Sequence, residues 1–300
     1  MSDIPFVHDM NDFDYGRVDR LSPRIRRVIA HNPGGFTFTG TGTYLVGNGA
    51  VAVIDPGPRD PAHVDAILNA LAPGETISHI LITHTHSDHS PATALLQPLC
   101  GAPSYGYGPH GGNRDEVQVE EGGDMDFVPD HVLRDGDVIE GGDWTIEAVH
   151  TPGHTSNHLC FALREEKVLF TGDHVMGWST SVISPPDGDM AAYMASLEKL
   201  LDRDDALYWP THGPAITEPK KFVRAFMTHR AMRDGQILKC LDQGLDTIPA
   251  MVALMYAKVD KRLHPAAARS VLAHMVRLVD QGRVEADGAV SLAARYRRAG

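Results

Sequence analysis

The sequence predicts an α/β protein with a smaller, mainly helical C-terminal domain. Apolar, β-prone runs alternate with helix-like segments as far as residue 210, and several of these runs end in turns that carry histidine or aspartate. Beyond residue 218 the balance of charge changes sign and helical periodicity dominates. We therefore expect a catalytic domain over residues 1–218 and a second domain over residues 219–300.

The expected strands are short apolar runs bounded by glycine, proline or polar turns. In chain order they cover residues 36–39, 43–46, 51–55, 79–83, 144–149, 158–162 and 168–171. The expected helices of the first domain carry apolar residues at helical spacing and cover residues 62–71, 91–99 and 190–201. Ser90 suits the N-cap of the second of these helices, with Pro91 as its first residue.

Four metal-capable side chains lie within six positions directly after the fourth expected strand. The segment reads H-x-H-x-D-H, and its members are His84, His86, Asp88 and His89. Imidazole and carboxylate suit Zn²⁺, Mn²⁺ and Fe. His84 and His86 are two residues apart, so in an extended stretch they project from the same side and can hold one ion. Asp88 and His89 come where the chain turns and can face a second ion.

Three further candidate ligands follow at later strand ends. His154 lies in Pro-Gly-His-Thr after the expected strand 144–149, and Asp173 follows the strand 168–171. His212 lies in Pro-Thr-His-Gly. Loops at strand ends are where α/β folds usually place their chemistry, so these residues extend the same candidate site.

The H-x-H-x-D-H motif and the ordered residues His154, Asp173 and His212 resemble the signature of the metallo-β-lactamase superfamily. This resemblance covers roughly residues 30–218 and implies an αββα sandwich with the metals at one edge between two sheets. It also implies a dinuclear site. One metal would be bound by His84, His86 and His154, and the other by Asp88, His89 and His212, with Asp173 as the bridge.

The chemistry of such a site is hydrolytic. Two metals about 3.5–4 Å apart hold a shared water, lower its pKa towards about 7 and stabilise the oxygens of the transition state. We expect two zinc ions, with manganese or iron as alternatives, and a metal-bridging hydroxide as nucleophile. Asp88 would orient that hydroxide. His158, four residues after His154, would either donate to a substrate oxygen or hold a ligand in place, and a packed structural role is the alternative.

Composition restricts the cellular setting. No run of 18 apolar residues predicts a membrane span, and the first residues lack the basic start and apolar stretch of a secretion signal. The three cysteines, Cys100, Cys160 and Cys240, are odd in number and far apart. They are typical of free thiols in a reducing compartment, so we expect a cytoplasmic protein.

The C-terminal domain has the element order of a winged helix. Residues 1–218 hold 12 Lys and Arg against 32 Asp and Glu, whereas residues 219–300 hold 15 against 7. Three helices are expected from residues 221, 247 and 265, followed by a hairpin in which residues 283–286 and 290–292 flank Asp287-Gly288. Such a basic module serves either to contact nucleic acid or to act as a lid or as a dimerisation module in a homodimer.

This combination resembles the β-lactamase-like protein 2 group, whose animal members are single-stranded-RNA endoribonucleases. Two substrate classes therefore stay open. One is a small molecule with a thioester, lactone or other acyl bond; the alternative is single-stranded RNA, hydrolysed at a phosphodiester. The first domain offers few cations for a polyanion. Two other histidines, His110 and His131, are expected at the surface, and His174 beside Asp173 is expected to be buried or to support the ligands.

Overall fold

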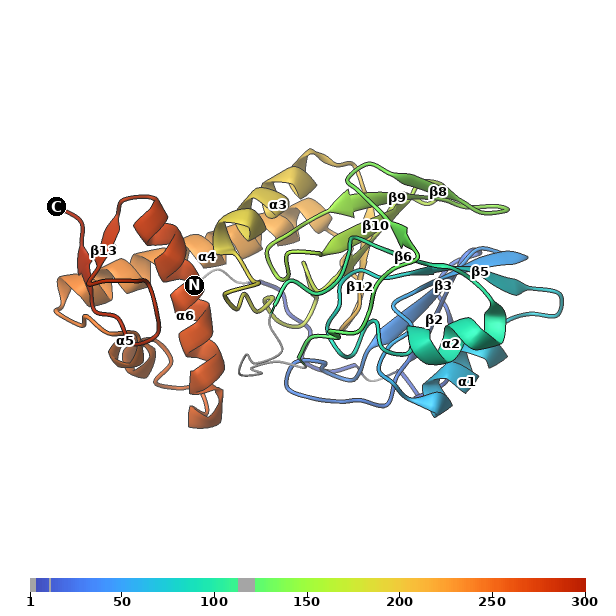
Figure 1. Ribbon diagram of the computed structural model, residues 1–300, viewed down its shortest axis with the longest axis horizontal. Helices are drawn as coiled ribbons and strands as arrows, with labels where there is room; N and C mark the ends of the chain where they lie inside the picture. Colours follow the sequence, from blue (N-terminus) through green and yellow to red (C-terminus); the bar gives the residue numbers. More distant parts are fainter. Residues whose placement is uncertain (1–3, 11, 113–121) are drawn as a thin grey trace.

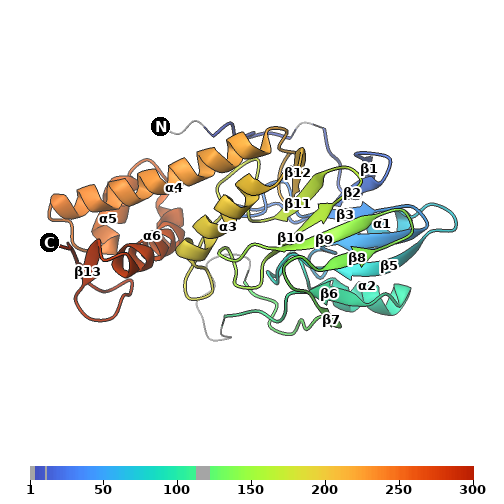
Figure 2. The same cartoon turned by 90° about the horizontal axis from the view of Figure 1, so that it is seen from above.

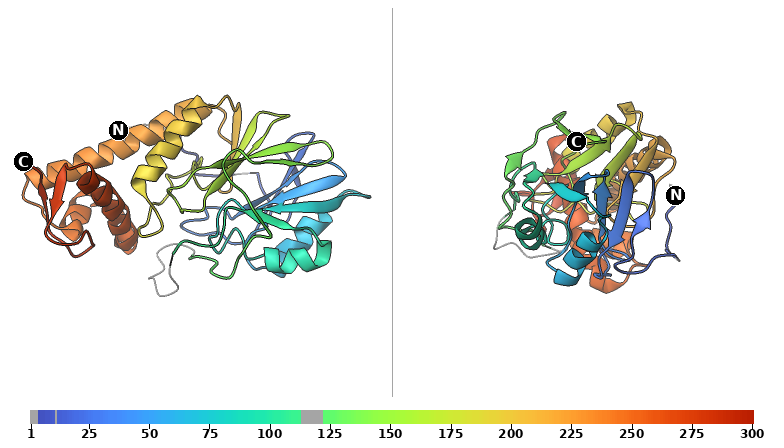
Figure 3. Two further views of the ribbon diagram at one scale, coloured as in Figure 1. Left: turned by 45° about the horizontal axis from the view of Figure 1, so that its top comes forward. Right: turned by 90° about the vertical axis from the view of Figure 1, so that its right-hand side faces the viewer.

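The computed structural model describes residues 4–10, 12–112 and 122–300. Two β-sheets face each other, and helices cover the outer face of each (Figures 1 and 3). Helices α1 (Pro61–Asn69) and α2 (Thr93–Cys100) pack on the first sheet. Helix α3 (Met190–Asp202) and the first turns of α4 (Pro219–Asp242) pack on the second. The predicted αββα sandwich is confirmed.

Within the described ranges the first sheet has seven strands, which follow one another in chain order. Strands β1 to β7 are Asp19–Arg20, Ile25–Ile29, Gly42–Val46, Ala50–Ile54, Thr76–Leu81, Ser104–Gly106 and His131–Val132. Strands β1 to β4 are antiparallel, and β4 to β7 are parallel. Parallel pairing needs a crossover, which α1 supplies between β4 and β5 and α2 between β5 and β6.

In the same described part, the second sheet has five strands in the order β12, β11, β10, β9, β8. Strands β8 to β12 are Val138–Glu140, Thr145–His150, Leu159–Leu163, Val168–Gly172 and Leu207–Pro210. Strands β9, β11 and β12 run in the same direction, because β10 is antiparallel to β9 and β11 while β12 is parallel to β11. Their carboxyl ends therefore lie at one edge of the sheet.

The core follows from the two-residue periodicity of the strands. Ala52 and Ile54 of β4 point between the sheets, whereas Val51 and Val53 point towards α1 and α2. Both faces of the central strands are buried, which explains why they are nearly continuous apolar runs. Trp144 links the sheets, because its indole N–H donates to the carbonyl oxygen of Ala50 over 2.7 Å.

The C-terminal domain consists of α4, α5 (Ile248–Met255), a 3₁₀ turn (Lys261–Leu263), α6 (His264–Asp280) and the hairpin of β13 (Val284–Ala286) and β14 (Tyr296–Arg298). Helices α5 and α6 pack with the second half of α4 around a separate core. Figure 2 shows α4 running from the second sheet into this domain. The boundary at residue 218 stays a prediction, and the helix that follows it belongs to both cores.

Some expected elements differ. Residues 36–39 form turns, and Phe38 has a positive φ of 57° and stacks on Trp178. The second strand of the hairpin lies at β14 and not at residues 290–292, because the Tyr296 hydroxyl donates to the carbonyl oxygen of Ser291 and holds that segment as a loop. Ser90 does not cap α2: its hydroxyl donates to Asp124 instead. No helix in the described ranges combines the length and apolar character of a membrane span.

Candidate metal centre

The seven predicted ligands meet at one edge of the sandwich. His84, His86, Asp88 and His89 follow β5, His154 follows β9, Asp173 follows β11 and His212 follows β12. Among the described residues, three groups of ligand atoms lie close enough to share an ion. These groups are His84, His86 and His154; His84, His89 and Asp173; and Asp88, His89 and His212.

The first group is a triangle of imidazole nitrogens. His86 Nδ1 lies 3.0 Å from His84 Nε2 and 3.1 Å from His154 Nε2. A tetrahedral zinc ion with bonds of about 2.0–2.1 Å has neighbouring ligand atoms about 3.3 Å apart. The three nitrogens are therefore spaced as three corners of such a tetrahedron.

The second group combines nitrogen and oxygen donors. Asp88 Oδ2 lies 3.2 Å from His212 Nε2 and 3.4 Å from His89 Nε2. Asp173 Oδ2 lies between the two groups, at 3.5 Å from His212 Nε2, 3.7 Å from His89 Nε2 and 3.9 Å from His154 Nε2. A carboxylate in this place can bridge two ions.

Hydrogen bonds set the tautomer of the histidines. His154 Nδ1 donates to the carbonyl oxygen of Val182 over 2.6 Å, and His212 Nδ1 donates to that of Gly40 over 3.2 Å. A ring nitrogen that faces a carbonyl is the donor, so Nε2 is the atom that each ring turns towards the other candidate ligands. Gly153, the residue before His154, has a φ of 137° and lies so close to the backbone of Tyr193 in α3 that a Cβ would not fit there.

Asp55, which the sequence pattern does not predict as a site residue, is hydrogen-bonded to ligands of both groups, directly to His89 and through Thr83 to His84. Its Oδ2 accepts from His89 Nδ1 over 2.9 Å and from Thr83 Oγ1 over 2.7 Å. Because Thr83 gives its proton to Asp55, its oxygen accepts from His84 Nδ1 at 3.1 Å. Thr211 Oγ1 also donates to Asp55, over 3.2 Å. One buried carboxylate thus orients two ligands, and the only sequence signal was an acidic residue at a strand end before Pro-Gly.

Asp88 has an orienting partner of its own. Thr41 Oγ1 donates to Asp88 Oδ2 over 2.7 Å, and Asn32 Nδ2 donates in turn to Thr41 Oγ1 over 2.9 Å. The Asn32 side-chain oxygen also accepts from the backbone N–H of Thr41. This pair comes from the loop after β2, so the N-terminal strands help to position the site.

The electrostatics fit divalent cations. Burial lowers the pKa of His84 and His86 well below the ordinary imidazole value, and neighbouring histidines lower it further, so these rings are neutral donors. Burial also lowers the pKa of His212, but Asp173 and Asp88 outweigh it and raise that pKa to about 10. Two buried polar atoms that face the site, His89 Nε2 and Asp173 Oδ1, have no hydrogen-bond partner. Bound cations would satisfy them, so the residues fit a metal centre.

His158 is buried between protein partners. Its Nε2 accepts from the backbone N–H of Asp173 over 3.2 Å, so its Nδ1 carries the proton and donates to Thr151 Oγ1 over 2.9 Å. The ring stacks on His84 at 5.1 Å. A direct role in catalysis stays a prediction, and these contacts favour the positioning of Asp173 and His84.

The other histidines divide between site and surface. His174 is buried with its ring 4.7 Å from that of Tyr193, and burial lowers its pKa to about 3. His131 is exposed, as predicted, and stacks on Tyr105. His110, expected at the surface, is half-buried: its Nδ1 lies 3.0 Å from Thr85 Oγ1 and its ring 6.0 Å from that of His86. His110 therefore lies beside the site, although its glycine-rich sequence is typical of a surface loop.

Comparisons with known proteins agree with this geometry. The family profile described as "Metallo-beta-lactamase superfamily" matches residues 37–212, and the profile "Beta-lactamase associated winged helix domain" matches residues 247–293. An atrochrysone carboxyl ACP thioesterase of Cryptosporiopsis is 34% identical over 75% of this chain and 65% of its own length. A lactamase-like protein of an Aspergillus species is 30% identical over 93% of this chain and 86% of its own length.

Solved structures show the same fold. A beta-lactamase domain protein of Burkholderia ambifaria superimposes with a TM-score of 0.79 at 19% identity over 96% of both chains. A metallo-beta-lactamase family protein of Thermus thermophilus superimposes with a TM-score of 0.76 at 21% identity, over 93% of this chain and all of its own. The chain is therefore a hydrolase that belongs to the metallo-beta-lactamase superfamily and carries the winged helix domain associated with it.

Proposed function

We propose that this protein is a zinc-dependent thioesterase with two metal ions. The observation that carries the proposal is the convergence of seven histidine and aspartate side chains. Hydrogen bonds from Nδ1 hold His154, His212 and His89 so that Nε2 of each ring faces the other ligands. The substrate class comes from the relatives, several of which are named as atrochrysone carboxyl ACP thioesterases.

The chain's own residues would divide the work. His84, His86 and His154 would hold one ion, Asp88, His89 and His212 the other, and Asp173 would lie between them. The bound ions would supply an activated water at neutral pH and polarise the acyl carbonyl. Asp55 and the Thr41–Asn32 pair keep the ligands in place, and burial excludes bulk water from the donor atoms.

A thioester suits this site because its leaving group needs little help. A thiol has a pKa of about 8.5, so a thiolate can depart without a strong proton donor. His158, the predicted catalytic histidine, is a poor proton donor to a leaving group because both of its ring nitrogens already have protein partners. Two of the three cysteines are buried and offer no competing nucleophile: burial raises the pKa of Cys160 to about 12, and Cys240 lies in the C-terminal core. The third, Cys100, is the last residue of α2, where its thiol contacts the carbonyl oxygen of Gln97.

The RNA alternative gains no support from the C-terminal arginines. Arg295 pairs with Asp246, Arg297 with Glu285, and Arg298 lies 3.6 Å from Asp242. Cations that already have carboxylate partners contribute less to phosphate binding. We therefore place RNA second to an acyl substrate. The homodimer and the cytoplasmic location stay predictions.

The test is a substrate panel with zinc-loaded protein. We expect hydrolysis of acyl thioesters of pantetheine, slower hydrolysis of the matching oxygen esters and lactones, and no cleavage of single-stranded RNA. Asp173→Ala should lose metal and thioesterase activity together, whereas His131→Ala, at an exposed position, should keep both. Cleavage of RNA in preference to every acyl substrate would overturn the assignment.

A further inference from the structure

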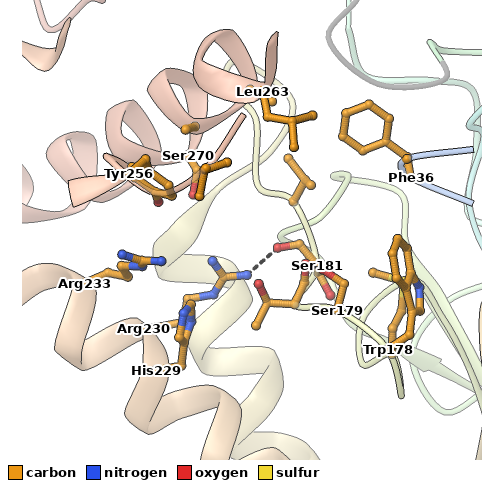
Figure 4. A pocket seen from close by; sticks show the side chains of 17 residues that line it. Phe36, Trp178, Ser179, Ser181, His229, Arg230, Arg233, Tyr256, Leu263 and Ser270 are labelled. Carbon is orange, nitrogen blue, oxygen red and sulfur yellow. Dashed lines mark hydrogen bonds between the residues drawn. The ribbon is translucent and has the colours of Figure 1, made fainter. Parts of the chain in front are cut away.

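A pocket of about 260 Å³ lies between the catalytic domain and the winged helix domain. One wall is the loop from Trp178 to Val182, and the opposite wall is formed by α4, α6 and the segment between α5 and α6. Figure 4 shows Arg230, Arg233 and Tyr256 on one side of this space, facing Trp178 and Phe36 on the other. Whole-ligand pockets typically measure about 300–1,000 Å³, so this one has room for part of a ligand.

Arg230 is a buried cation in this pocket without an acidic partner. Arg230 is only 2% exposed, and one of its guanidinium nitrogens donates to the carbonyl oxygen of Ser181. Its Nε has no hydrogen-bond partner, and no carboxylate in the described part of the chain forms an ion pair with it. The guanidinium lies over the Tyr193 ring at 5.2 Å. A buried charge with an unused N–H costs stability unless a counter-charge arrives, and an anionic ligand would be that counter-charge.

Neighbouring groups add unused hydrogen-bonding capacity. Trp178 Nε1 and His229 Nδ1 are buried atoms without partners, and both residues line the same pocket. Arg233 lies over the Tyr256 ring at 4.6 Å and donates to Gln236 with a single nitrogen, which leaves other N–H groups for a ligand. The remaining lining is mainly apolar and aromatic. Its chemistry thus suits an aromatic or apolar body that ends in an oxyanion.

The pocket wall is attached directly to the candidate metal centre. Ser181 Oγ donates to the carbonyl oxygen of Asp173, and the carbonyl oxygen of Val182 accepts from His154. Trp178 lies against Gly213, the residue after His212. A molecule whose reactive bond lay at the metals could therefore extend past this wall into the pocket.

We propose that this pocket binds a carboxylate or phosphate oxyanion at the distal end of the substrate, with Arg230 and Arg233 as its partners. The identification of the occupant as substrate rests on the proposed function; the oxyanion site itself does not. Two parts of a thioester could supply the anion: a carboxylate on an aromatic acyl group, or the phosphate of a carrier arm.

Isothermal titration of the zinc-loaded, full-length protein tests the site without turnover. The probes are benzoate, phenyl phosphate and the neutral benzamide. We expect both anions, or one of them, to bind more tightly than benzamide, and Arg230→Gln or Arg233→Gln to weaken that binding roughly 10- to 100-fold, because each removes a charge-assisted hydrogen bond. Preference for benzoate would assign the anion to the acyl group, and preference for phenyl phosphate would assign it to the carrier arm.

The controls separate this site from the metals and from folding. Arg224→Gln changes an exposed arginine on the same helix, outside the pocket, and should bind the probes like the wild type. Anions that bind to zinc would do so equally in all variants of equal metal content. Arg233 is half-exposed, so its variant keeps the test valid if Arg230→Gln does not fold. Unchanged anion affinity in the folded variants, or benzamide binding as tightly as benzoate, would overturn the proposal. Failure of thioester hydrolysis alone would leave it standing.

Discussion

At the scale of single residues, the candidate ligands are held by a buried carboxylate, Asp55, that belongs to none of the ligand groups. Asp55 accepts from His89 and Thr83, and Thr83 accepts from His84, so one side chain fixes the orientation of a ligand in each group. Partners of this kind typically contribute 10- to 100-fold in metal affinity. The precision of the site therefore depends on residues outside the three groups of candidate ligands.

The first prediction concerns this carboxylate. Asp55→Asn should keep the fold but weaken zinc binding by roughly 10- to 100-fold, because an amide cannot accept from His89 and Thr83 with the strength of a carboxylate. Competition with a chromogenic zinc chelator measures the affinity. Asp65→Asn, at an exposed position of α1, is the matched control. Equal zinc affinity in wild type and Asp55→Asn would show that the hydrogen bonds do not tune the site.

The second prediction concerns His158. Its contacts with the Asp173 backbone and with His84 lead us to expect that His158→Ala weakens zinc binding along with turnover. A direct catalytic role would instead lower turnover by about 10²–10⁴-fold at unchanged metal affinity. Zinc titration and kinetics at saturating zinc, carried out on the same preparations, distinguish the two: full recovery of turnover at saturating zinc excludes a direct catalytic role.

At the scale of elements, the H-x-H-x-D-H segment could be predicted as a ligand loop because its chemistry is written in adjacent residues. Strand β2 could not, since Arg26 and Arg27 interrupt its apolar pattern. Both are buried: Arg26 pairs with Glu75 at 2.6 Å and Arg27 with Asp19 at 3.1 Å. These partners are distant in sequence or lie on another strand, so tertiary pairing overrides the local pattern.

The support of the site was hidden for the same reason. In the sequence Asp55 is an ordinary acidic residue at a strand end; only the fold brings it together with Thr83, which follows β5, and Thr211, which follows β12. Asp287-Gly288 is a strong local turn signal that predicts the second strand of the hairpin directly after it, whereas β14 is set by the pairing of Glu285 with Arg297 and of Ala286 with Tyr296. Local signals identified the elements, and non-local contacts set their ends.

A third prediction concerns the contact of α1 with the first sheet. Burial lowers the pKa of His63 to about 4, although Asp60 opposes this effect, and the ring lies 2.8 Å from Thr43 Oγ1. As the pH falls, His63 takes up a proton near pH 6.5 in the unfolded chain but only near pH 4 in the folded chain. Protonation therefore favours the unfolded state, and folding stability falls as the pH drops from about 6.5 to about 4. The loss attributable to His63 is roughly 2–3 kcal/mol between pH 7 and pH 4.5.

The measurement is urea unfolding of chelator-treated wild type and His63→Gln at both pH values. The variant should lose less stability on acidification than the wild type, while His131→Gln, at an exposed position, should behave like the wild type. Parallel losses in wild type and His63→Gln would contradict the prediction.

At the scale of the whole molecule, α4 joins the two domains into one mechanical unit. Its first half contributes Phe222, Val223 and Phe226 to the core against the second sheet, and its second half contributes Ile237 and Leu238 to the winged helix core. Helix α6 also reaches the catalytic domain, because Arg269 donates to the carbonyl oxygen of Pro185. Because α4 packs in both cores, unfolding of one domain removes packing contacts from the helix that the other domain needs. We therefore expect the two domains to unfold together.

The fourth prediction tests this coupling with probes that report different domains. All three tryptophans, Trp144, Trp178 and Trp209, precede α4, but Trp178 lines the pocket between the domains. In a Trp178→Phe background, fluorescence therefore reports the catalytic domain, whereas far-ultraviolet circular dichroism also reports the helices of the winged helix domain. The two thermal midpoints should coincide. Ile237→Ala removes a buried side chain from the distant core, at a cost of about 2–5 kcal/mol, and should lower the fluorescence midpoint as much as the dichroism midpoint. A fluorescence midpoint that stays at the wild-type value would mean that the domains unfold independently and that α4 frays at their junction.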